Sequence, residues 1–193
     1  MLGGVLWTTY HVALAFRPAG CIAAECDLPG RSFRDAGQLD LILLAAVLLL
    51  AGGLTGLVLL ARRAGRFGRV GRVGLGASVA GAATIAGGIV FQAIVVCCDF
   101  PLQPWFVLPG GLTLVLGLLL VGIALLQARV LPPWVALMLI IGSLTMLGFN
   151  DQNDRVVLAV PFGLAWIVVG AVLWSGTAAA HIAQGRRNAG RER

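Results

Sequence analysis

Five long stretches without a charged residue constrain the fold of this chain more than any other feature. A helix needs about 20 apolar residues to cross a bilayer core about 30 Å thick. Each stretch reaches that length, which predicts an all-α, polytopic transmembrane helical bundle. The stretches are residues 41–60, 73–96, 105–128, 130–149 and 156–180.

Residues 1–16, MLGGVLWTTYHVALAF, form a sixth and shorter apolar candidate. The segment lacks the basic start of a cleaved signal peptide, and no clear cleavage site follows it. We therefore expect a retained helix. The prediction is a single integral membrane domain over residues 1–193 with six spans, or five if residues 1–16 do not span.

Composition supports a membrane protein and limits its chemistry. Only 11% of the residues are charged and the mean hydropathy is +0.96, whereas soluble domains carry about 25% charged residues. All 14 basic residues are arginine. Without a lysine the chain cannot form a Schiff base with retinal or pyridoxal phosphate, and we expect no cofactor. The arginines lie in loops between apolar spans, so we also expect no nucleic-acid partner.

The arginines predict how the chain is oriented. One side of the predicted bundle carries ten arginines and a single acid, and the other carries four arginines and seven acids. Cytoplasmic loops are enriched in basic residues, so we expect a bacterial plasma (inner) membrane protein with a cytoplasmic C-terminus. Near an anionic surface each arginine contributes about 1 kcal/mol. Five loop arginines are therefore predicted to contact lipid head groups: Arg62, Arg63, Arg66, Arg69 and Arg72.

Small residues predict close helix contacts. Gly76, Ala80, Thr84 and Gly88 recur every four residues, and Gly52 and Gly56 repeat the spacing. Small residues let helix backbones approach closely in membranes. We expect packing within the bundle, and the alternative is a homodimer contact.

A few side chains are the candidates for a pocket inside the bundle. Gln92 and Thr84 are polar, Pro161 is expected to kink the last span, and Trp166 falls near mid-membrane with an N–H that needs an acceptor. Ordinary helix packing explains each of them. The alternative is a polar path for a small permease or channel.

The four cysteines lie on the predicted outer side. Cys21 and Cys26 precede the second span, and Cys97 and Cys98 follow the third. Disulfides persist on the oxidising side of a membrane, and three pairings are open. We expect structural disulfides. The alternative is an exoplasmic thiol–disulfide or quinone-linked oxidoreductase, but the low-pKa Cys-x-x-Cys arrangement is absent.

Five polar residues separate the last two spans: Asn150, Asp151, Gln152, Asn153 and Asp154. Asn and Asp favour turns and cap helix starts, which predicts a tight helical hairpin. The alternative is a site for a cation or for an arginine of a partner.

No catalytic or metal-binding motif is present, and no acid lies deep in a span, which argues against ion-coupled transport. The leading interpretation is a non-enzymatic membrane component: an accessory subunit, scaffold or structural protein with a disulfide-stapled outer face. A homo-oligomer or a membrane-complex partner is expected.

Overall fold

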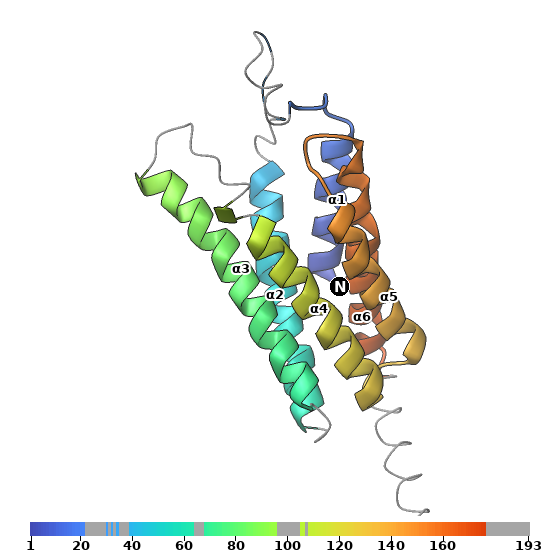
Figure 1. The fold of residues 1–193 in the computed structure, drawn as a ribbon. Helices are drawn as coiled ribbons and strands as arrows, with labels where there is room; N and C mark the ends of the chain where they lie inside the picture. The colour runs from blue at the N-terminus through green and yellow to red at the C-terminus, as the bar shows by residue number, and fades with distance from the viewer. Residues whose placement is uncertain are drawn as a thin grey trace, which may run out of the picture.

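The computed structural model is all-α and describes residues 1–21, 30, 32, 34, 39–63, 68–95, 105–106 and 108–176 (Figure 1). Six α-helices and two short 3₁₀ helices make up its regular structure. They are α1 (Leu2–Ala15), α2 (Leu39–Arg63), α3 (Arg69–Val95), α4 (Leu108–Ala128), α5 (Pro133–Thr145), η3 (Met146–Gly148), η4 (Asp154–Ala159) and α6 (Val160–Trp174).

Four helical segments are long and apolar enough to cross a membrane, which indicates an integral multi-pass membrane protein. They are Leu41–Arg62, Arg69–Gly88, Leu108–Ala128 and Asp154–Trp174. The other two helices are shorter. α1 has 14 residues, or about 21 Å at 1.5 Å per residue, and the apolar helix with α5 ends at Gly148. Six helices are therefore found, but six membrane spans are not confirmed.

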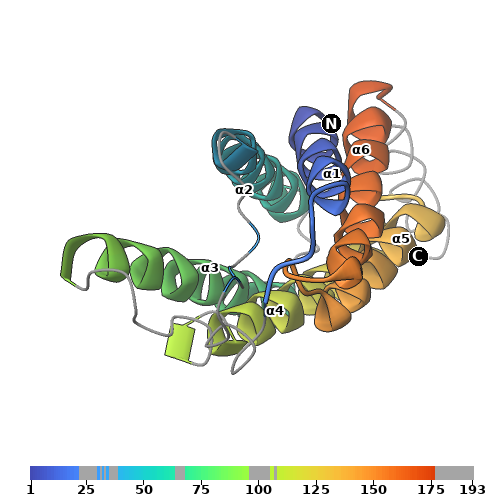
Figure 2. The same cartoon turned by 90° about the horizontal axis from the view of Figure 1, so that it is seen from above.

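Helix α1 lies between α2 and α6 (Figures 1 and 2). Two adjacent glycines make this possible. A Cβ at Gly3 would meet the backbone of Leu50 on α2 at 2.9 Å. A Cβ at Gly4 would meet Gly163 and Ile167 on α6, with the Ile167 nitrogen 2.8 Å away. The N-terminal helix therefore depends on glycine on both of its packed sides.

The tightest helix pair is α3 with α4, joined by what we call the α3–α4 seam. A Cβ at Gly81 would reach the Leu114 backbone, and one at Gly117 would reach Ser78. The Ser78 hydroxyl donates to the Gly74 carbonyl at 2.9 Å and so uses its polar atom within its own helix. The buried residues in the described part of α3 are Gly71, Gly74, Ser78, Gly81 and Gly88. Of these, Gly74, Ser78 and Gly81 meet α4.

The small residues predicted to pack are mostly not the ones that meet α4. Gly76, Ala80 and Thr84 are exposed, and only Gly88 of that series is buried, against Phe106. The physical reason is helical geometry. Four residues turn a helix by about 400°, so steps of four drift about 40° each, whereas alternating steps of three and four keep one face.

The main hydrophobic core lies among α2, α4, α5 and α6, with Leu57, Leu125 and Trp166 among its buried members. Helix α3 lies beside α4 at one edge of the bundle and stands apart from α2 (Figure 2). As a result, only 22% of the apolar stretch in α2 and in α3 is buried, against 39% in α4 and in Asp154–Trp174.

Pro161 occupies the first turn of α6 rather than its interior. Proline is tolerated there because the first helical N–H groups have no intrahelical acceptor. The expected kink is therefore a change from the 3₁₀ helix η4 to the α-helix α6. Gly142 of α5 packs at this junction, where a Cβ would lie 3.0 Å from the Pro161 carbonyl oxygen.

Candidate functional site

The most organised polar structure lies at the end of the bundle where α1 finishes and α5 turns back towards α6 (Figure 1). We call it the polar cap. Its centre is Arg34, a charged side chain that is only 9% exposed. The other described members of the polar cap are Pro18, Gly20, Cys21, Ser32 and residues 150–154.

Backbone carbonyls hold the Arg34 guanidinium. Nε donates to the Pro18 carbonyl oxygen at 3.0 Å. Nη1 donates to the carbonyl oxygens of Asp151 at 2.8 Å and Asn153 at 3.3 Å. Hydrogen bonds from a charged donor are stronger than neutral ones, so one side chain fastens the end of α1 to the α5–α6 turn.

Backbone hydrogen bonds reinforce this attachment. The Arg34 N–H donates to Gln152 Oε1 at 2.7 Å, and the Gly20 N–H donates to the Gln152 carbonyl at 2.8 Å. The Cys21 N–H donates to the Ser32 carbonyl at 3.0 Å. A Cβ at Gly20 would collide with Gln152 Oε1 and the Arg34 nitrogen, so glycine is required for the close approach.

The turn of residues 150–154 also organises itself. Asn150 Oδ1 accepts from the Gln152 N–H at 2.8 Å, and Asn153 Oδ1 accepts from the Arg155 N–H at 2.9 Å, which caps η4. Within the described part of the chain, the carboxylates of Asp151 and Asp154 make no ion pair that would hold an arginine. The turn thus receives an arginine of its own chain, through carbonyls rather than carboxylates.

His11 lies in the aromatic cluster next to the polar cap and is 2% exposed. Its Nδ1 is 2.8 Å from the Trp7 carbonyl oxygen, and since a carbonyl only accepts, Nδ1 carries the proton. Ring centroids of Trp7, Tyr10 and Phe149 lie 4.5, 4.8 and 5.3 Å from the imidazole.

Trp7 links this aromatic cluster to α6. Its indole N–H donates to the Ala159 carbonyl at 3.0 Å, at the last residue of η4. Its ring meets Phe162 edge to face at 5.4 Å. No group of three or more metal-binding side chains occurs among the described residues. The site's geometry is that of a structural clasp over an aromatic cluster.

The pocket candidates from the sequence lie on different helices. Thr84 is exposed on α3 and donates to the Ala80 carbonyl at 2.9 Å. Pro161 and Trp166 lie on α6, where Trp166 is 5% exposed and packs in the main core. The indole N–H of Trp166 has no hydrogen-bond partner in the structure as described. The side chain of Gln92 lies outside the described residues.

Cys21 is the one cysteine in the described residues, and it is 1% exposed. Cys26, Cys97 and Cys98 lie outside them, so the predicted pairings stay predictions. Among the loop arginines, Arg62, Arg69 and Arg72 are exposed. Arg66 and the side chain of Arg63 lie outside the described residues.

Sequence reasoning missed the role of Arg34, which it counted only as a charge on the acidic side. The available signal was weak: one arginine in a loop and a polar turn with more members than a turn needs. The comparisons with protein families, curated proteins and solved structures found no match to this chain.

Proposed function

We propose that this protein is a non-enzymatic component of a membrane assembly, with α2 and α3 packing against another protein. The observation that carries the proposal is a set of small residues left unpacked on these two helices. A Cβ added at Gly52, Gly56 or Gly76 would have no neighbouring atom within 4 Å. Ala80, one turn further along α3, is also exposed.

Small residues are enriched where membrane helices meet, because they allow backbones to approach. The packed glycines of this chain follow that rule at the α3–α4 seam and around α1. The unpacked glycines of α2 and α3 have the same character but lack a partner within the described residues. A partner helix would supply the missing contacts, and the homodimer contact is one form of this assembly.

The polar side chains support a structural role. Arg34, Gln152 and Asn153 are occupied in holding the polar cap together. We propose that disulfides strengthen the same end, which would face the oxidising side of a bacterial plasma membrane. The burial of Cys21 supports this proposal.

The test of the assembly is to purify wild type and the Gly76→Leu variant separately from native membranes and compare the proteins that co-purify with each. Leucine at this exposed position leaves the bundle intact but fills the space that a partner helix needs. We expect wild type to retain a protein partner or a second copy, and Gly76→Leu to lose it while keeping its thermal stability. Gly111→Leu on α4 is the matched control, since Gly111 also has open space around it. Equal retention by all three proteins would refute the proposal.

A further inference from the structure

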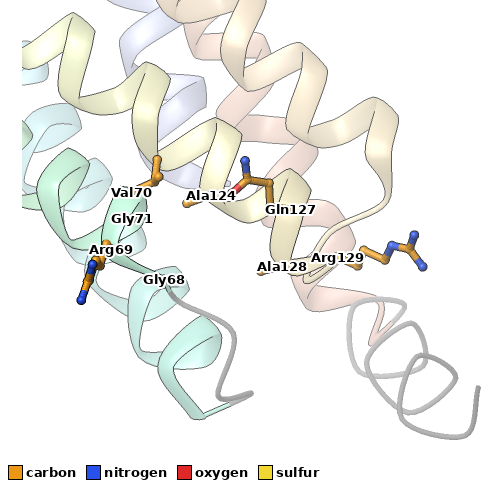
Figure 3. Close-up of a pocket in the computed structure, with 8 residues that line it drawn as sticks. All are labelled: Gly68, Arg69, Val70, Gly71, Ala124, Gln127, Ala128 and Arg129. Atoms are coloured by element: carbon orange, nitrogen blue, oxygen red, sulfur yellow. The ribbon is translucent and has the colours of Figure 1, made fainter. Parts of the chain in front are cut away.

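A hollow lies between the first turn of α3 and the last turn of α4 at the arginine-rich end (Figure 3). Its volume is about 570 Å³, within the range of about 300–1,000 Å³ that small-molecule sites occupy. Eight of the described residues line it: Gly68, Arg69, Val70, Gly71, Ala124, Gln127, Ala128 and Arg129. These eight include two arginines and no acid.

The side chains that line the hollow include donors suited to an anion. Arg69 and Arg129 stand on opposite sides, and their exposed side chains point outward in Figure 3. Gln127 points across towards α3 in the same view. The first hydrogen bond of α3 runs from the Arg72 N–H to the Gly68 carbonyl, so the N–H groups before it are not used by the helix.

Arg129 sits where a glycine would be expected. Its φ of +50° is the left-handed conformation that ends many helices. Its N–H donates to the Leu126 carbonyl at 3.2 Å, and the Val130 N–H donates to that of Leu125 at 3.4 Å. Any residue that tolerates this φ would close α4. Arginine adds a cation at the rim of the hollow.

The floor of the hollow is apolar. Ala124 and Ala128 of α4 are buried and small, and they leave room beneath the arginines. Val70 adds an apolar side chain from α3. A freely dissolved anion gains nothing from such a floor. An amphipathic ligand gains from both parts, because its charged group meets the rim and its hydrocarbon meets the floor.

We infer that the hollow binds the phosphodiester head group of one anionic phospholipid, with Arg69, Gln127 and Arg129 as its polar contacts. Basic pockets between membrane helices are a recognised setting for anionic head groups. The inference is independent of the proposed assembly through α2 and α3, and it assigns to Arg129 a role beyond closing α4.

To test this inference, the full-length protein is released from bilayers that contain equal amounts of phosphatidylglycerol and phosphatidylcholine. Native mass spectrometry then measures which lipid stays bound. We expect wild type to retain one phosphatidylglycerol molecule. The Arg69→Gln, Arg129→Gln double variant should lose the preference for it by about thirtyfold, as two charge contacts are removed. Arg72→Gln is the matched control, because Arg72 is exposed in the same turn but does not line the hollow.

A thermal unfolding measurement checks that the double variant is folded. We expect it to be as stable as wild type, because both side chains are exposed. Three results would overturn the inference. One is equal phosphatidylglycerol retention by wild type and the double variant. The second is an equal loss in Arg72→Gln, which would indicate general surface charge. The third is displacement of the lipid by millimolar inorganic phosphate, which would mark a site for free phosphate.

Discussion

Arg34 and Gln152 are 118 positions apart and lie in direct contact, with the Arg34 N–H donating to Gln152 Oε1 at 2.7 Å. The Arg34 side chain then bonds the carbonyls on both sides of Gln152, those of Asp151 and Asn153. This arrangement joins the segment after α1 to the turn before α6. The polar turn is thus explained by a contact within the chain.

Replacing Arg34 by glutamine should destabilise the protein strongly. The change removes three hydrogen bonds from a charged group to carbonyls, and we expect a loss of about 2–3 kcal/mol in the free energy of unfolding. Denaturant unfolding in lipid nanodiscs measures it. Arg155→Gln is the control, since the exposed Arg155 lies directly after the turn, at the start of η4. Equal stability of the two variants would show that the clasp contributes nothing.

Gly4→Ala should separate α1 from α6. The new methyl group would press on the Gly163 carbonyl and the Ile167 nitrogen, both backbone atoms that cannot turn aside. Overpacking of this kind costs about 1–3 kcal/mol. Gly111→Ala, in open space on α4, should be neutral or stabilising by up to about 1 kcal/mol. Thermal unfolding of the two variants side by side decides whether α1 is packed in this way.

Two tryptophan-to-phenylalanine changes should differ in cost. Trp7→Phe loses the hydrogen bond from the indole N–H to the Ala159 carbonyl. Trp166→Phe removes an N–H that has no acceptor among the described residues, so it loses packing alone. We expect Trp7→Phe to be less stable by about 1 kcal/mol. Equal unfolding free energies would contradict the hydrogen-bond assignment.

Thiol alkylation in native membranes should leave Cys21 unmodified until a reductant is added. Our proposal pairs this buried sulfur in a disulfide, which alkylating reagents do not attack. Intact mass before and after mild reduction, with quinone oxidised or reduced, is the measurement. Modification of Cys21 without reductant would show that Cys21 is a free thiol and would refute the proposed disulfide. Opening of a pair only when quinone is reduced would favour the oxidoreductase alternative.

The sequence predicts the helices well and their contacts poorly, for physical reasons. Length and hydropathy are local properties, so each of the six apolar segments contains an α-helix in its described residues. The choice of packed face depends on rotation about each helix axis, which a few glycines do not settle: Gly76 matched a packing pattern, but Gly74 and Gly81 make the contact. Arg34 binds backbone carbonyls, and a carbonyl is present at every residue. No sequence pattern can point to such a partner.

We propose that α2 and α3 meet a protein partner in the membrane. Photo-cross-linking from a reactive residue placed at Ala80 tests this contact, with Leu116 on α4, also exposed, as the comparison position. We expect a protein adduct of defined mass from position 80 in native membranes and none from position 116. Lipid adducts alone from position 80 would contradict it and leave the exposed side of α3 facing the bilayer.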